Sequence, residues 1–220
     1  MPAEPKSLLL VEDDVQLRLL LSVVLTHSGY RVRVAEDGFS ALAAIRGEVP
    51  DMVLADLYMS GMSGFELLSV IRRRFPAIAV VAMSSAFSGE EVPPGVAADA
   101  FYQKATSVFS LLRIMEETSR REVPHRDEGH GEAAPIWIAS HPQGEPAHKS
   151  VVVTCPECLR TSAHAPGLSF VAVRTTQCVY CRTPIHYAVV QTVDASPAKP
   201  LWRPIESATA SLQLSAKIAG

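Results

Sequence analysis

The sequence predicts an α/β protein: a doubly wound, five-stranded parallel sheet, followed by a second, small β-rich domain. Over residues 1–120, short apolar runs that lack polar alternation take turns with stretches of helical periodicity. Such runs are typical of strands buried on both faces, and their alternation with helices is typical of a doubly wound sheet. The second domain is indicated by four cysteines that all lie beyond residue 150, in two Cys-x-x-Cys pairs.

Local signals set the bounds of the expected elements. Gly29 ends the first helix, because glycine favours the position just after a helix, and Phe75-Pro76 ends the third. The arginines at 72–74 are interpreted as a solvated helix C-terminus rather than as a nucleic-acid patch. The expected strands span 6–11, 30–35, 51–55, 78–83 and 100–103, and the expected helices span about 14–28, 38–47, 64–74 and 107–120.

Two of these strands end in carboxylates. The apolar run 8–11 is followed by Glu12 and Asp13, and the run 52–55 is followed by Asp56. If the runs are adjacent parallel strands, their carboxyl ends place these side chains in one crevice, where open α/β sheets bind ligands. Carboxylates that close cannot all stay ionised without a cation. The sequence therefore predicts a hard divalent metal with oxygen ligands, Mg²⁺, and a carboxylate left free to react.

Two further polar residues follow predicted strands: Ser84 comes after 78–83, and Lys104 comes after 100–103. An ammonium can pair with an anionic phosphoryl oxygen, and a hydroxyl can donate a hydrogen bond to another. Each residue alone has an ordinary explanation, such as a strand-end turn, a helix cap or a solvated charge. Their recurrence in order, each after a buried-strand pattern, favours a site for one transferred phosphate.

Four ordered motifs carry a family resemblance: Leu-Leu-Val-Glu-Asp-Asp (9–14), Asp-Leu-Tyr-Met-Ser-Gly-Met-Ser-Gly-Phe-Glu-Leu-Leu (56–68), Met-Ser-Ser-Ala (83–86) and Phe-Tyr-Gln-Lys (101–104). With them, residues 6–120 resemble a receiver domain of the two-component response-regulator family, whose fold is flavodoxin-like. The resemblance implies that Asp56 accepts phosphate from a sensor histidine kinase or a phosphotransfer protein. It also implies that Asp13 ligates Mg²⁺ and that Glu12 holds the metal through water.

The same resemblance implies a switch. Ser84 would swing toward the phosphoryl group and Lys104 would pair with it. Phe101 matches the family's aromatic switch residue, which turns inward when the serine moves. An acyl phosphate adds negative charge and acceptor oxygens, which can draw a hydroxyl and its loop inward. The expected function is therefore a response regulator of a phosphorelay, and not an enzyme.

Departures from the family pattern lead to further expectations. Pro93-Pro94-Gly95 lies where the family has its fourth helix, and proline costs a helix interior about 3 kcal/mol, so this helix is expected to be short or partly unwound. Ser60 and Ala105 replace two usual prolines, and the second change removes the reason for a cis peptide after the lysine. Bulky Tyr58 is expected to shield the acyl phosphate from water and to slow its loss, which the dephosphorylation rate of a Tyr58→Asn variant would test.

Charge and hydropathy narrow the classes of function. Residues 1–120 carry 11 basic and 15 acidic side chains, and residues 121–220 carry 9 and 8. Neither balance is basic enough to indicate nucleic-acid binding, which is left open. No apolar stretch is long enough to span a membrane, and the first is too short for a signal peptide. A cytoplasmic protein without membrane contact is expected.

The chain is expected to divide into a receiver domain (1–120), a flexible linker (121–149), a zinc-ribbon-like domain (150–193) and a C-terminal tail (194–220) that ends in a short helix near 205–218. Prolines, glycines and charges mark the linker. Its histidines are irregularly spaced and are expected to lie in solvent rather than to bind metal.

The cysteines are Cys155, Cys158, Cys178 and Cys181, and nineteen residues separate the two pairs. This spacing is typical of a four-cysteine Zn²⁺ site, and a small antiparallel ribbon needs such a staple because its core is small. Disulfides are disfavoured in a reducing cytoplasm, and a redox dithiol would need a thioredoxin-like βαβ context. An iron site of rubredoxin type is a further alternative. His164 and His186 are not expected to be ligands.

The output is expected to be contact with a downstream protein that the sequence does not name. One alternative is a transcriptional response regulator whose ribbon contacts DNA or RNA polymerase, which salt-dependent binding of the isolated ribbon to DNA would separate. Another is a metal-dependent phosphohydrolase. That class would need a second aspartate two residues after the nucleophile, where Tyr58 stands.

Overall fold

The computed structural model describes residues 5–93, 96–120, 135–140, 151–164 and 173–191. A parallel sheet of five strands, in the order β2-β1-β3-β4-β5, forms the centre of the N-terminal part. Its strands are β1 (Ser7–Val11), β2 (Arg31–Ala35), β3 (Met52–Asp56), β4 (Ala79–Ser84) and β5 (Ala100–Gln103). The predicted fold class is confirmed, and the strand order reverses beside β1, which is where doubly wound sheets bind ligands.

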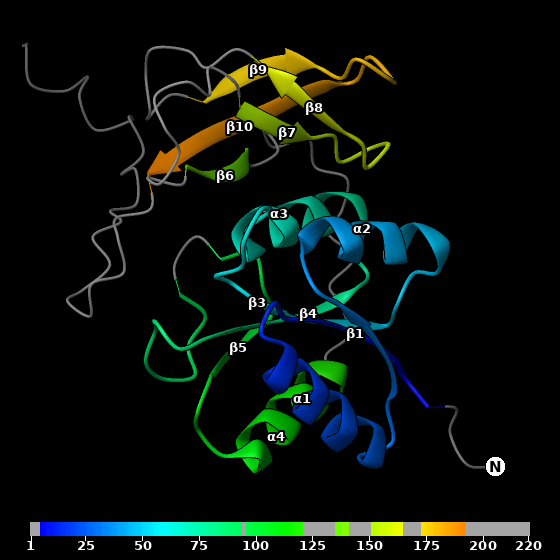
Figure 1. Ribbon diagram of the computed structural model, residues 1–220, viewed down its shortest axis with the longest axis vertical. Coiled ribbons are helices and arrows are strands. Elements are labelled where there is room, and N and C mark those ends of the chain that lie inside the picture. Colours follow the sequence, from blue (N-terminus) through cyan, green and yellow to red (C-terminus); the bar gives the residue numbers. More distant parts are fainter. Residues whose placement is uncertain (1–4, 94–95, 121–134, 141–150, 165–172, 192–220) are drawn as a thin grey trace, which may run out of the picture.

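Four described helices cover the two faces of this sheet. Figure 1 shows α1 (Val15–His27) and α4 (Val108–Arg120) on one face and α2 (Gly38–Gly47) and α3 (Gly64–Arg74) on the other. Side-chain caps fix three of the helix starts, because a cap oxygen accepts a hydrogen bond from an otherwise unpaired backbone N–H. The capping residues are Asp14, Asp37 and Ser63.

The connection between β4 and β5 departs from a helix more completely than the sequence predicts. Within the described residues 85–93 and 96–99 the chain forms bends and no helix. A backbone hydrogen bond from Val96 to Pro93, 3.1 Å long, closes one turn of it. Phe87 and Val92 pack against the core cluster on the α3 side. The loop therefore fills part of the space that a helix would cover.

The remaining described strands form a small β-rich unit, which we call the four-cysteine module (135–140, 151–164 and 173–191). Two antiparallel hairpins make up most of it: β7 (Val151–Thr154) with β8 (Thr161–His164), and β9 (Arg174–Gln177) with β10 (Pro184–Gln191). Strand β6 (Ile136–Ser140) adds to the second hairpin by pairing in parallel with β10. The apolar residues at 170–172 and the tail helix expected near 205–218 lie outside the described residues.

Strand β6 corrects one expectation. Residues 136–140 lie in the segment 121–149, which the sequence predicts to be a flexible linker, yet they form a strand of the module. The physical reason is the run Ile-Trp-Ile, because Ile136 and Ile138 are 1% and 6% exposed and point into the shared core. The linker interpretation is therefore wrong for these five residues.

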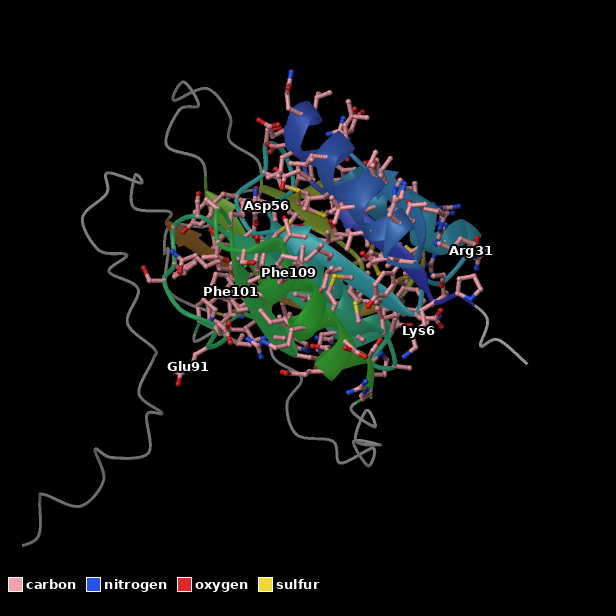
Figure 2. The ribbon with its side chains drawn as sticks, turned by 90° about the horizontal axis from the view of Figure 1, so that it is seen from below. Lys6, Arg31, Asp56, Glu91, Phe101 and Phe109 are labelled. Carbon is pink, nitrogen blue, oxygen red and sulfur yellow. The ribbon has the colours of Figure 1, made fainter. Side chains whose placement is uncertain are left out.

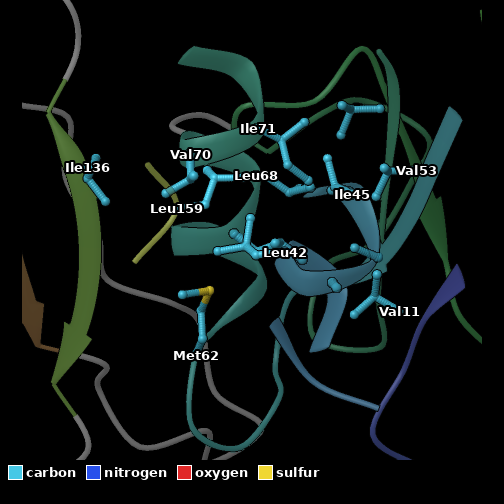
Figure 3. Close-up of a cluster of buried hydrophobic side chains, with 14 of the residues drawn as sticks. Val11, Leu42, Ile45, Val53, Met62, Leu68, Val70, Ile71, Ile136 and Leu159 are labelled. Atoms are coloured by element: carbon cyan, nitrogen blue, oxygen red, sulfur yellow. The ribbon is translucent and has the colours of Figure 1, made fainter. Parts of the chain in front are cut away.

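The module lies directly on the receiver half of the molecule. Figure 1 shows its strands over α2 and α3, and α3 contacts β6 along its length. In Figure 3, α3 lies between β6 and the parallel sheet: Val70 points toward Ile136, whereas Ile71 points toward Val53. One continuous cluster of buried apolar side chains thus runs from the sheet through α3 into the module. Across the described part of the chain, none of the helices has the length and apolar character needed to cross a membrane.

Candidate functional site

Three carboxylates meet at the carboxyl ends of β1 and β3. Strands β1 and β3 are paired with Val11 opposite Ala55, so Glu12 and Asp56 leave their strands at the same edge of the sheet. One carboxylate oxygen from each of Glu12, Asp13 and Asp56 lies within 4.8 Å of the others. Glu12 and Asp56 are almost fully buried, whereas Asp13 is half-buried.

Figure 2 views the molecule from the side of α1 and α4. Asp56 and Phe101 lie toward one end of the sheet, and Lys6 and Arg31, where β1 and β2 begin, lie toward the other. Asp56 and Phe101 thus lie toward the same end of the sheet, as expected for residues near the carboxyl ends of parallel strands.

Lys104 reaches into the acidic crevice from the end of β5. Its ammonium lies 2.6 Å from Asp56 Oδ2 and 2.7 Å from Glu12 Oε2. The backbone N–H of Lys104 also donates to the carbonyl of Ser84, which fixes where the side chain begins. The peptide bond after Lys104 is trans, and Ala105 turns the chain with φ of 64°. The lysine expected from the sequence is therefore in direct contact with the proposed phosphoacceptor.

The electrostatics of the crevice favour a bound cation. Burial raises the pKa of Asp56 above its ordinary value, and it does the same for Glu12, although hydrogen bonds from Lys104 oppose both shifts. Burial alone would lower the pKa of Lys104, but its hydrogen bonds to Asp56 and Glu12 outweigh this and raise it. Three ionised carboxylates and one ammonium leave two negative charges without a counter-charge. One divalent cation would neutralise them.

The loops around the crevice hold its carboxylates in place. The backbone N–H of Ser60 donates to Asp13 Oδ2 at 3.2 Å, and that of Tyr58 donates to Asp56 Oδ1 at 3.2 Å. Arg18 on α1 donates to the backbone carbonyls after β1, at 2.6 Å for Glu12 and 3.2 Å for Asp13. An all-oxygen donor set held this way fits Mg²⁺, which prefers carboxylate and water ligands.

Ser84 and Phe101 are buried residues of the neighbouring strands β4 and β5. Ser84 is 1% exposed, and its hydroxyl oxygen accepts a hydrogen bond from the backbone N–H of Ala86 at 3.0 Å. Phe101 is fully buried and meets Phe87 edge-on, with ring centroids 6.1 Å apart. Ser84 therefore stands at the start of the loop that contains Phe87, and Phe87 contacts Phe101 of β5.

An aromatic chain that the sequence did not indicate continues from this pair. Phe87 also lies against Tyr58 and Phe65, with centroids at 6.2 Å and 6.5 Å, and Tyr58 meets Phe65 edge-on at 5.7 Å. Tyr58 is 40% exposed and leaves the loop after Asp56, whereas Phe65 belongs to the first turn of α3. Phe87 lies in an irregular loop, where no periodicity in the sequence could have revealed its partners.

Helix α3 begins almost in contact with the end of β3, the strand that carries Asp56. A Cβ on Gly64 would come within 2.7 Å of the Leu57 Cα, and the Asp56 carbonyl lies closer still. Only a residue without a side chain lets the helix start there. The backbone N–H of Gly64 donates to the Leu57 carbonyl at 3.1 Å. The position of α3 is therefore tied to the residues at 56–57.

The four cysteines lie together at the turns of the two hairpins of the module. All four Sγ atoms lie within 4.8 Å of one another, and the pairs Cys155–Cys181 and Cys158–Cys178 are 3.6 Å apart. None is in a disulfide. A tetrahedral ion with metal–sulfur bonds of about 2.3 Å requires sulfur–sulfur edges of roughly 3.8 Å, so the arrangement fits a metal centre and not two disulfides.

The two cysteine loops, 155–159 and 178–182, repeat one backbone pattern. In each, the residue after the second cysteine donates its N–H to the carbonyl of the first at 2.9 Å. That residue has positive φ, 55° at Leu159 and 63° at Arg182. The hydrogen bond with Thr183 lowers the pKa of Cys181 to about 6, whereas burial raises the pKa of Cys155 to about 12 and also raises that of Cys158. Neither His164 nor His186 belongs to the cluster, and both rings bond to neighbouring hydroxyls.

Comparison with known families decides what the N-terminal part is. The family profile described as "Response regulator receiver domain" matches residues 8–103. This part of the chain is a response regulator receiver domain. All four motifs lie within or immediately around the match, and the receiver domain includes the acidic crevice described above.

Relatives of the receiver domain occur in longer proteins. The chain is 33% identical over 138 residues to the transcriptional regulatory protein GlrR of Escherichia coli, which is 60% of this chain and 30% of GlrR. It is 29% identical over 120 residues to the probable transcriptional regulatory protein TcrX of Mycobacterium tuberculosis, which is 54% of this chain and 51% of TcrX. The chain thus spans about half or less of the length of these relatives.

Among solved structures, the response regulator TrrA of Thermotoga maritima, in complex with Mg²⁺ and BeF, is 28% identical. The match covers 51% of this chain and 98% of that chain, with a TM-score of 0.48.

Proposed function

We propose that the chain is a response regulator of a two-component phosphorelay, in which Asp56 accepts a phosphoryl group and thereby switches the receiver domain. The observation that supports this most directly is the contact between Lys104 and Asp56 inside a cluster of three carboxylates. A buried carboxylate that is paired with a lysine and has two acidic neighbours matches the needs of phosphoryl transfer to an aspartate.

The transfer makes one bond and breaks one. An oxygen of Asp56 attacks phosphorus, and the bond from phosphorus to its leaving group breaks in line. The leaving group is the imidazole nitrogen of a kinase histidine, or the acetate oxygen of acetyl phosphate. Lys104, already 2.6 Å from Asp56, pairs with an oxygen of the incoming group. Bound Mg²⁺, held by Asp13 and Asp56 and through water by Glu12, would supply a divalent charge that offsets the negative charge of the reacting oxygens.

Ser84 supplies the second half of the proposed switch. Its hydroxyl can rotate away from Ala86 and donate to a phosphoryl oxygen, which exchanges one hydrogen bond for a charge-assisted one. The Ser84 backbone carbonyl accepts a hydrogen bond from Lys104, so this end of the loop between β4 and β5 stays in place when the rest of the loop moves. When Phe87 in that loop moves, Phe101 moves with it, because the two rings are in contact. The proposed roles of these residues therefore form one connected path.

Acetyl phosphate tests this function without the cognate kinase. The full chain is incubated with acetyl phosphate and Mg²⁺, and intact mass is measured for the wild type and for Asp56→Asn. The wild type is expected to gain the mass of one phosphoryl group, and Asp56→Asn is expected to gain none. A wild type that stays unmodified in the presence of Mg²⁺ would refute the proposal.

We further propose that Cys155, Cys158, Cys178 and Cys181 hold a structural Zn²⁺. The support is the tetrahedral spacing of the thiols and the repeated loop geometry. Elemental analysis of the purified chain is expected to find one zinc per molecule, and a Cys158→Ser variant should hold much less. Iron in place of zinc, with visible absorption, would support the rubredoxin-type alternative.

The proposed setting is a cytoplasmic signalling protein and not an enzyme acting on a metabolite. Its phosphoryl donor would be a sensor histidine kinase or a phosphotransfer protein, and its output would pass to a downstream protein. GlrR and TcrX are named as transcriptional regulators, but the matched share of each is small. Output through contact with DNA or RNA polymerase is therefore the alternative function. Salt-dependent DNA binding by the phosphorylated full chain would distinguish it from output through a protein partner.

A further inference from the structure

The two proposed sites are joined by one helix. Helix α3 starts next to Asp56 and runs beneath the four-cysteine module, with one apolar face toward the sheet and the other toward β6. The module side includes Ile136 and Leu159, which belong to the same buried cluster as Val70. A rigid element packed on both sides transmits small displacements, because close-packed interfaces do not deform smoothly.

Polar contacts place both ends of α3 against the first cysteine loop (155–159). At the first turn, the Thr154 hydroxyl donates to Glu66 Oε1 at 3.1 Å, and both residues are buried. At the last turn, Arg74 Nε donates to the Glu157 carbonyl at 3.4 Å and lies 3.9 Å from the Glu157 carboxylate. Thr154 and Glu157 stand on either side of the thiol Cys155. The helix therefore holds the loop that carries two of the four metal-binding thiols.

The other end of this path is the phosphoacceptor. Gly64 brings the helix start against the backbone of Asp56 and Leu57. Phe65, next in the helix, contacts both Tyr58 from the loop after Asp56 and Phe87 from the loop after Ser84. These are the two loops that a phosphoryl group on Asp56 would address. A movement of either one changes a ring contact on the first turn of α3.

We infer that phosphorylation of Asp56 loosens the four-cysteine module from α3, so that receiver state and metal retention are coupled within this chain. The inference rests on the proposed phosphorylation of Asp56, and it identifies the module as the receiver's own first target. When Ser84 gives up its bond to Ala86 for a phosphoryl oxygen, Phe87 loses its ring contacts with Tyr58 and Phe65. The first turn of α3, with Glu66, then loses the support that holds Thr154.

Coupling of this kind is reciprocal and measurable. A ligand that binds better to one of two states shifts affinity at the other site by the same factor, usually about 5- to 150-fold. The measurable quantity is the rate at which a chromogenic chelator removes zinc from the full chain. Zinc-loaded protein is compared with and without acetyl phosphate and Mg²⁺, and intact mass gives the phosphorylated fraction of each sample. Zinc release is expected to be at least about fivefold faster in the phosphorylated protein, because a loss of affinity of this size falls mainly on the dissociation rate.

Variants separate coupling from side effects. Asp56→Asn is expected to release zinc at the unphosphorylated rate whether or not acetyl phosphate is present. Thr154→Val removes the hydroxyl that Glu66 accepts from, so its unphosphorylated zinc release should already be fast, and phosphorylation should add little. Ser162→Ala is the matched control, because Ser162 lies in the same hairpin but bonds to His164. It should behave as the wild type.

A second measurement covers the case in which Thr154→Val does not fold. Beryllofluoride stands in for the phosphoryl group, and zinc affinity of the wild type is measured with and without it. A drop of at least about fivefold is expected. Protein that is fully phosphorylated by mass yet releases zinc at the unchanged rate would overturn the inference and leave the proposed function standing. Absence of any mass gain would instead sink the proposed function.

Discussion

The receiver domain and the four-cysteine module are stabilised in different ways. Strands β1 and β3 of the receiver are buried on both faces along their whole length. Strands β7, β8 and β9 of the module have only four residues each. Val152 in β7, Val173 just before β9 and Tyr180 in the second cysteine loop are 46%, 55% and 55% exposed. Small domains with so little core generally need a metal, disulfides or a neighbouring domain to be stable. The receiver domain is therefore stabilised by its own core, whereas the four-cysteine module relies on contacts outside its small core.

Metal removal should separate the two regions most strongly. Structural zinc contributes about 10–16 kcal/mol of apparent binding free energy in small domains, far more than the module's apolar contacts can replace. After chelation, hydrogen exchange should become fast in residues 151–164 and 173–191 and stay slow in β1 and β3. Mass spectrometry of peptides from these segments measures this, and Cys158→Ser should give the same result without a chelator. Slow exchange in the metal-free module would mean that docking alone stabilises it.

Gly64 tests how firmly α3, the helix that contacts the module, is fixed to β3 within the receiver domain. An Ala at this position would collide with the backbone of residues 56–57, so Gly64→Ala is expected to lower the free energy of unfolding by more than about 3 kcal/mol. Gly47→Ala is the matched control, because a Cβ at this helical glycine would meet nothing within 4 Å, so the substitution should change the free energy of unfolding by no more than about 0.5 kcal/mol. Urea unfolding measures both. Equal losses would show that α3 is not tightly fixed to β3.

Glu66 gives the interface a pH dependence. Burial raises the pKa of Glu66 from 4.5 to about 7, although the hydrogen bonds of Thr154 oppose the shift. The folded state then binds more protons than the unfolded state between these values, so this contribution is complete below pH 4.5 and is lost as pH rises through 7. The difference corresponds to roughly 3 kcal/mol.

A Glu66→Gln variant isolates that contribution. It should match the wild type near pH 4.5 and be more stable at pH 8, by up to about 3 kcal/mol, because no buried charge has to form. Urea unfolding at both pH values checks this, with Glu116→Gln as the control, because the Glu116 side chain lies on the exposed face of α4. A variant less stable than the wild type at pH 8 would show that the ionised carboxylate is needed for docking.

Sequence reasoning succeeded where physics is local. Continuous apolar runs with acidic ends identify β1 and β3, because each signal acts within a few residues. Pro93-Pro94 predicts that the helix between β4 and β5 is short or partly unwound, and the described residues of this connection form no helix at all. The spacing of the cysteines indicates their cluster for the same reason.

Docking could not be predicted this way. Glu66 and Thr154 are 88 residues apart, and a Glu at the start of a helix is ordinarily explained by the helix dipole. The run Ile-Trp-Ile at 136–138 was a usable signal, but it is short and lies among prolines and charges that favour a linker. Only the folded chain shows that α3 offers these isoleucines an apolar partner.

The smallest predicted effects come from a backbone feature that both regions share. Ala105 in the receiver and Arg182 in the module adopt φ of 64° and 63°, a conformation that costs side-chain-bearing residues about 1–2 kcal/mol. Glycine avoids that cost but loses more entropy on folding, so each substitution should gain about 0.5–1 kcal/mol. Ala105→Gly should raise the urea midpoint and leave zinc affinity unchanged. Arg182→Gly should raise zinc affinity roughly two- to fivefold in chelator competition. A gain that appears in both measurements for either variant would mean that the two regions share their stability more evenly than their cores suggest.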